Sequence, residues 1–105
     1  MYKELKKMIV YAPNGILSKE LIKTETLNLT LFCMAKGTEI SEHTSTKEGT
    51  VYVIEGKGLF YLAGKKVIMI PGTLILMKKN QKHSLKAEEN TAFILSLINS
   101  IEGKK

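Results

Sequence analysis

Two histidines, His43 and His83, are the side chains of this sequence best suited to metal or acid–base chemistry at neutral pH. The 105 residues include ten acidic residues, all Glu, and sixteen basic residues, all Lys. Cys33 is the only cysteine, which excludes an intrachain disulfide, a Cys-x-x-Cys redox pair and a cysteine-rich zinc site. For the two histidines this leaves two kinds of chemistry: their imidazoles can coordinate a metal ion or transfer a proton.

The spacing of His43 and Ser45 predicts one shared site. Residues two apart on a β-strand face the same side, so both side chains line one pocket if that side is the interior of a barrel, and His83 would join them from a strand distant in sequence. Two neutral imidazoles and a hydroxyl form an incomplete site for a divalent ion such as Zn, Fe, Mn, Ni or Cu, with water or substrate completing it. Two alternatives stay open: metal-free hydrogen bonding of the histidines, or metal-free acid–base work.

The elements that position these residues are predicted to be strands, because the dominant hydrophobic period is two. In residues 27–35, alternate residues from Leu27 to Ala35 share a face that we expect to be buried, and Phe32 belongs to the opposite, mixed face. Residues 59–62 and 67–70 predict a hairpin. Further strands are predicted at 51–54, 73–77, 83–86 and 91–98. Short strands at this spacing indicate an all-β sandwich or barrel.

The length fits one domain over residues 1–105. We place the barrel core at about 27–98 and interpret 1–26 as an N-terminal strand or arm. Leu5, Met8 and Ile9 suggest a short helix, and residues 18–25 are compatible with helix or strand. A chain this small has a modest core, and several strands are apolar on both faces, so we predict a homodimer.

Two stretches resemble the motifs of the cupin superfamily. Gly37, His43 and Gly56 match the first motif, G-x5-H-x-H-x3,4-E-x6-G, and Gly72 and His83 match the second, G-x5-P-x-G-x2-H-x3-N. With the strand pattern between them, the resemblance covers about residues 27–98. It implies a double-stranded β-helix, or jelly-roll, barrel that is often dimeric and has a pocket at its open end.

The sequence also departs from these motifs. The resemblance implies three His and one Glu as metal ligands, but Ser45 stands at the second His position and Gly49 at the Glu position. Glu48 precedes the Glu position of the motif by one residue. A shift of one residue turns a strand side chain to the opposite face unless a bulge intervenes. In the second motif Lys78, Asn80 and Ala87 replace Pro, Gly and Asn; Asn tolerates left-handed backbone. Half of the expected metal site is therefore missing.

The net charge of +6 raises the question of nucleic acid, but lysines on turns and edge strands also protect sheet edges. Because the chain has no Arg or Trp to read or stack on bases, we expect no nucleic-acid partner.

No apolar run is long enough to span a bilayer, so we expect no membrane association. Cys33 on an apolar strand is expected to be buried and inert, and a lone cysteine favours the cytoplasm.

These observations favour a small-molecule-binding barrel whose pocket is lined by His43, Ser45 and His83. The alternative is a metal-dependent enzyme of dioxygenase or isomerase type that uses His43 and His83 with water ligands. The sequence does not decide whether the protein is an enzyme, and it identifies no ligand.

Overall fold

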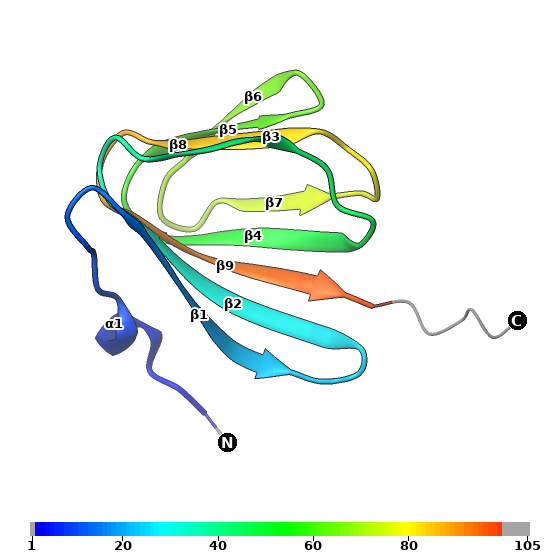
Figure 1. The fold of residues 1–105 in the computed structure, drawn as a ribbon, viewed down its shortest axis with the longest axis horizontal. Coiled ribbons are helices and arrows are strands. Elements are labelled where there is room, and N and C mark those ends of the chain that lie inside the picture. Colours follow the sequence, from blue (N-terminus) through cyan, green and yellow to red (C-terminus); the bar gives the residue numbers. More distant parts are fainter. Residues whose placement is uncertain (1, 100–105) are drawn as a thin grey trace, which may run out of the picture.

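The computed structural model describes residues 2–99, in which two antiparallel sheets face each other (Figure 1). One sheet has the strand order β1-β2-β9-β4-β7, and the other has the order β3-β8-β5-β6. This arrangement confirms the predicted all-β jelly-roll barrel. The strands are β1 (Ile16–Lys23), β2 (Leu27–Met34), β3 (Glu39–His43), β4 (Glu48–Glu55), β5 (Gly58–Leu62), β6 (Lys65–Met69), β7 (Leu74–Met77), β8 (His83–Ala87) and β9 (Thr91–Ile98).

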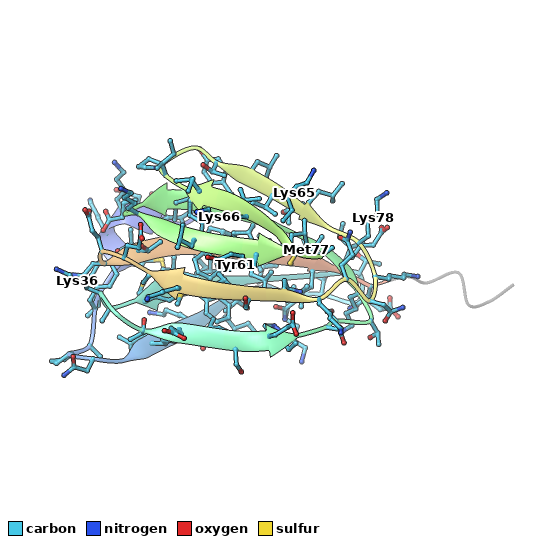
Figure 2. All side chains as sticks on the ribbon, turned by 90° about the horizontal axis from the view of Figure 1, so that it is seen from above. Lys36, Tyr61, Lys65, Lys66, Met77 and Lys78 are labelled. Atoms are coloured by element: carbon cyan, nitrogen blue, oxygen red, sulfur yellow. The ribbon has the colours of Figure 1, made fainter. Side chains whose placement is uncertain are left out.

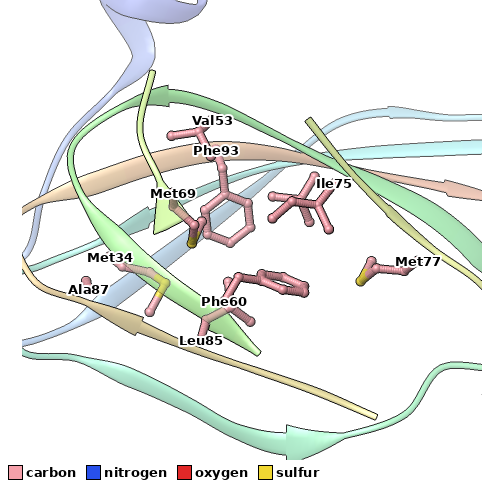
Figure 3. Close-up of a cluster of buried hydrophobic side chains, with 10 residues drawn as sticks. Met34, Val53, Phe60, Met69, Ile75, Met77, Leu85, Ala87 and Phe93 are labelled. Atoms are coloured by element: carbon pink, nitrogen blue, oxygen red, sulfur yellow. The ribbon is translucent and has the colours of Figure 1, made fainter. Parts of the chain in front are cut away.

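The main core lies between the two sheets, where alternate side chains of both inner faces meet (Figure 3). Phe60 and Val53 are fully buried there, and Phe93 packs with them from β9. The predicted hairpin is present as β5 and β6, which pair from Gly58–Met69 to Leu62–Lys65. Strand β1 settles the ambiguity over residues 18–25, because it pairs with β2 along the sheet edge.

A second apolar cluster lies on the outer face of the five-stranded sheet. Leu31 and Cys33 of β2 are buried there beneath the N-terminal segment, which includes the short helix α1 (Leu5–Met8) (Figure 1). The predicted face of strand 27–35 is therefore buried as expected, but it packs under the N-terminal segment rather than between the sheets. Residues 2–15 act as a cover for this outer face.

The lysines between residues 57 and 86 lie outside the core. Lys65 and Lys66 on β6 and Lys78 after β7 are exposed, as Figure 2 shows from above the four-stranded sheet. Within residues 2–99, no helix has the length and apolar character needed to cross a membrane.

Candidate functional site

A cavity of about 250 Å³ lies between the two sheets, next to the main core. The five-stranded sheet contributes Phe32, Val51, Met77, Phe93 and Leu95 to its wall. The four-stranded sheet contributes Ile40, Phe60 and Leu85, together with His43 and His83. The cavity is therefore apolar except for the two imidazole rings.

Strands β3 and β8 bring His43 and His83 together. The two residues are paired in the antiparallel register, and their ring centroids are 4.1 Å apart with the planes inclined by 65°. The register shifts between Ile40 and His43, so three steps on β3 match two steps on β8. Without this bulge, strict alternation would turn His43 away from the face that Ile40 occupies. The bulge explains why both residues line the cavity.

Each imidazole is oriented by a backbone carbonyl. Nδ1 of His43 lies 2.8 Å from the carbonyl oxygen of Ser41, and Nδ1 of His83 lies 3.1 Å from that of Gln81. A carbonyl oxygen only accepts hydrogen bonds, so Nδ1 donates in both rings. In the neutral rings Nε2 therefore carries the lone pair, free to accept a hydrogen bond or to bind a metal ion.

The two histidines differ in their exposure. His83 is 6% exposed, whereas His43 is exposed to solvent. Burial lowers the pKa of His83, the hydrogen bond to the Gln81 carbonyl opposes this, and the nearby His43 lowers it further. Because burial is the largest of these effects, His83 is neutral at neutral pH.

Acid should destabilise the protein through His83. Above pH ~6.5 the ring is neutral in both the folded and the unfolded chain. As the pH falls through this value the unfolded chain takes up the proton first, so the free energy of unfolding falls until the pH reaches the lower pKa of the folded state. The groups that face the ring are His43, the Gln81 carbonyl and otherwise apolar side chains. Urea unfolding between pH 7.5 and 5 measures this slope, which the His83→Phe variant should reduce. An unchanged slope in the variant would contradict the assignment.

Ser45 does not share the strand face of His43, because β3 ends at His43 and Ser45 lies in the following loop. The Oγ of Ser45 accepts a hydrogen bond from the backbone N–H of Lys47 at 3.0 Å. Its carbonyl oxygen accepts one from the N–H of Asn80 at 2.7 Å. Ser45 is not among the residues that line the cavity. The two-residue spacing was therefore misleading, and Ser45 instead joins the loops after β3 and β7.

Gly49, at the position where the motif expects a glutamate, has no room for a side chain. Gly49 is buried on the inward face of β4, and a Cβ atom added to it would lie 2.6 Å from the carbonyl oxygen of Ser96 and 2.8 Å from the side chain of Leu97. Glu48 is exposed and does not line the cavity, as expected for a side chain one residue out of register. Neither residue adds a carboxylate to the histidine pair.

A metal ion would therefore have two imidazole ligands from this chain at the histidine pair. Residues 2–99 contain no group of three or more His, Cys, Asp or Glu side chains that could hold a metal ion together. The four-ligand cage that the sequence motif implies does not fit these residues, whereas an open two-imidazole site completed by water does.

The second motif keeps its turn despite its substitutions. Asn80 has a φ of 64°, the left-handed conformation expected for a residue that replaces glycine. In the same loop, the side chain of Gln81 accepts a hydrogen bond from the backbone N–H of Lys78. This loop holds the Gln81 carbonyl that orients His83.

Cys33 lines a different hollow, of about 270 Å³, between β1, β2 and the N-terminal segment. Burial, the largest effect, raises the pKa of its thiol. A hydrogen bond from the backbone of Val10 opposes this, and the charge of Glu55 makes a smaller contribution that raises the pKa. Burial also raises the pKa of Tyr11, whose hydroxyl donates to Glu55 at 2.8 Å. The thiol is therefore protonated at neutral pH. The prediction that Cys33 is buried is confirmed, and its inertness stays a prediction.

The aromatic walls of the cavity were not identified as site residues from the sequence. Phe32 and Phe93 pair across β2 and β9 with their ring centroids 5.1 Å apart and their planes within 5°. Phe60 is parallel to His83 at 6.0 Å. A signal for these residues exists in the alternation of β2, where Phe32 occupies the face opposite Leu31 and Cys33. This alternation identifies Phe32 as part of the cavity wall only once the face that carries Phe32 is known to point between the sheets.

Comparison with known proteins gives one family and several related folds. A family model described as the cupin domain matches residues 30–99. No curated protein sequence matches the chain. A conserved protein of unknown function from Streptococcus pyogenes is similar in structure, with a TM-score of 0.86 at 23% identity, over 95% of this chain and 88% of that one.

Two further structures have the same fold. A cupin superfamily protein from Desulfitobacterium hafniense has a TM-score of 0.86 at 17% identity, over 91% of this chain and 88% of that one. A cupin 2 conserved barrel domain protein from Leptotrichia buccalis has a TM-score of 0.83 at 28% identity, over 90% of this chain but 46% of that one.

Proposed function

Because this chain belongs to the cupin family, we propose that it is a barrel protein that binds a small molecule in the cavity between its two sheets. The observation that carries the proposal is the cavity itself, which has apolar walls and two imidazoles whose Nε2 atoms have no hydrogen-bond partner within residues 2–99. A concave, mostly apolar site with a few convergent polar groups is the usual form of a ligand site. His43, an exposed residue that lines the cavity, marks its solvent side.

Filling the cavity should abolish ligand binding. Leu95 lines the cavity and is only partly buried, so Leu95→Trp would place an indole in the ligand space with limited strain. Ligand-observed NMR with a mixed set of uncharged, anionic, cationic and sugar compounds should find binders that the variant loses. The matched control is Leu74→Trp, because Leu74 is 65% exposed and does not line the cavity. Binders retained equally by both variants, or a complete lack of binders, would contradict the proposal.

A metal-dependent enzyme, of dioxygenase or isomerase type, is the second candidate. It is favoured by the orientation of the rings, since histidine ligands usually donate one ring N–H to a carbonyl or carboxylate and bind the metal through the other nitrogen. The metal would supply Lewis-acid or redox chemistry, while His43 and His83 would hold it with water completing its coordination. Ser45 contributes no ligand in this arrangement, since its Oγ accepts the Lys47 N–H.

Metal retention separates the two candidates. A two-imidazole site lacks the third protein ligand of a catalytic zinc site, so we expect EDTA to strip any metal from protein purified without added metal ions. Metal content is measured by mass spectrometry on wild type, on the His43→Ala/His83→Ala double variant and on Ser45→Ala as a control. Stoichiometric iron, zinc, manganese, nickel or copper that survives EDTA in wild type and Ser45→Ala, but disappears in the double variant, would favour the enzyme.

A further inference from the structure

The walls of the cavity restrict the kind of molecule that can fill it. Apart from His43 and His83, its lining side chains are aliphatic, aromatic or thioether, and none is a lysine or glutamate. A carboxylate or phosphate inside it would be desolvated without an opposite charge to compensate it. A sugar would bury several hydroxyl groups, of which two Nε2 atoms can satisfy only a minority. The composition of the wall therefore favours an uncharged, mainly apolar ligand.

The shape of the walls favours a flat ring. Each sheet presents one pair of parallel rings: Phe32 and Phe93 from the five-stranded sheet, Phe60 and His83 from the four-stranded sheet. Aromatic rings prefer offset-stacked or edge-to-face partners, so a planar aromatic molecule is the kind of partner that these rings favour. An apolar cavity of ~150 Å³ is enough to hold benzene, so about 250 Å³ leaves room for a substituted monocyclic ring.

The histidines favour a ligand that carries one hydrogen-bond donor. In both rings Nδ1 is committed to a backbone carbonyl, so an imidazole in its neutral form offers Nε2 as an acceptor and no donor. A ligand that carries only acceptors, such as a ketone or an ether, would leave Nε2 of the buried His83 without a partner. A hydroxyl group supplies the missing donor, and a phenol stays uncharged at neutral pH because its pKa is ~10.

We propose that the cavity binds uncharged, planar aromatic molecules bearing a hydroxyl group, with the ring between the aromatic walls and the hydroxyl donating to Nε2 of His83 or His43. This inference rests on the proposed function and names the ligand class of the same site. The anionic alternative would depend on the loop lysines after β3 and β7, such as Lys47 and Lys78, which are exposed and lie outside the lining of the cavity.

Three compounds with the same methyl-substituted ring test the proposal: p-cresol, toluene and p-toluate. At pH 7.5 we expect p-cresol to bind roughly three- to tenfold more tightly than toluene, the value of one hydrogen bond. We expect p-toluate to bind at least about tenfold more weakly than p-cresol. Affinities come from NMR titrations that follow the methyl signals of Met77, Ile40 and Leu95, with the imidazole 15N signals reporting on the hydrogen bond.

The variant His43→Phe/His83→Phe should keep toluene binding and remove the preference for p-cresol, because it retains the rings and deletes both acceptors. If the double variant does not fold, His43→Phe and the 15N shift of His83 in wild type give the same comparison. Equal binding of p-cresol and toluene, or tightest binding of p-toluate, would overturn the ligand class while leaving the proposed function intact. Binding of none of the three would also overturn it, and the library screen with Leu95→Trp decides the proposed function independently.

Discussion

Gly49→Glu, which restores the glutamate of the sequence motif, should unfold or severely destabilise the protein. We expect the free energy of unfolding to fall by about 4 kcal/mol or more, which is comparable to the total stability of a small domain. A Cβ atom at this position already meets the Ser96 carbonyl at 2.6 Å, and Ser96 cannot move aside because β9 is paired on both sides, with β2 and with β4. The added carboxylate would also start from a buried position, where removing its charge from water is costly.

Two further variants separate the backbone clash from the charge. Gly49→Ala adds only the Cβ atom and should cost about 1–3 kcal/mol. Gly15→Ala is the matched control, because a Cβ atom there would lie 3.4 Å from its nearest neighbour, the Cβ of Ala12, and it should change stability by less than about 1 kcal/mol. Urea unfolding followed by circular dichroism measures all three. Wild-type stability in Gly49→Glu, with increased metal retention, would mean that the site can be rebuilt and that the position is not closed.

Phe60→Ala should remove about 3–5 kcal/mol from the free energy of unfolding. Phe60 is fully buried and belongs to the core between the sheets (Figure 3). Its ring is parallel to that of His83, with the centroids 6.0 Å apart. Its loss would join the space of a deleted ring to the existing cavity, where neighbouring side chains cannot close the gap without shifting both sheets. The midpoint of urea unfolding should fall accordingly.

The neighbouring residue gives the control for Phe60. Tyr61 points to the outer face of β5 and is 40% exposed, so Tyr61→Ala should cost much less, about 1 kcal/mol or below. If both variants lost the same stability, the inner and outer faces of β5 would be assigned wrongly. The cavity would then have a different wall.

The sequence was sufficient for most of the strands. Period-two alternation and turn residues predicted seven strands between residues 27 and 98, because side-chain alternation along a strand is a local property. They did not predict β3 (Glu39–His43), and they left β1 (Ile16–Lys23) open between helix and strand. The left-handed turn at Asn80 followed in the same way from its place in the motif. The homodimer and the expectation of no nucleic-acid partner stay predictions, because both depend on contacts outside one chain.

The site was only partly predictable. The motifs identified His43 and His83, and the structure brings their rings to 4.1 Å from each other. Ser45 was wrongly expected to share the face of His43, because an alternation rule assumes a regular strand and β3 ends at His43 after a register shift. The aromatic wall was missed for a related reason: both faces of β2 are apolar, so its sequence could not show that Phe32 points inward.

The sequence by itself therefore determined an all-β chain with two imidazoles and no complete ligand cage, since residue types and local spacing are enough to define both. The tertiary structure decided which face of each strand encloses the cavity, because that depends on the second sheet and on the N-terminal cover. It also decided that the backbone of β9 leaves no room for a side chain at Gly49, which is a contact between residues nearly fifty positions apart. Long-range packing of this kind leaves no pattern in either strand alone.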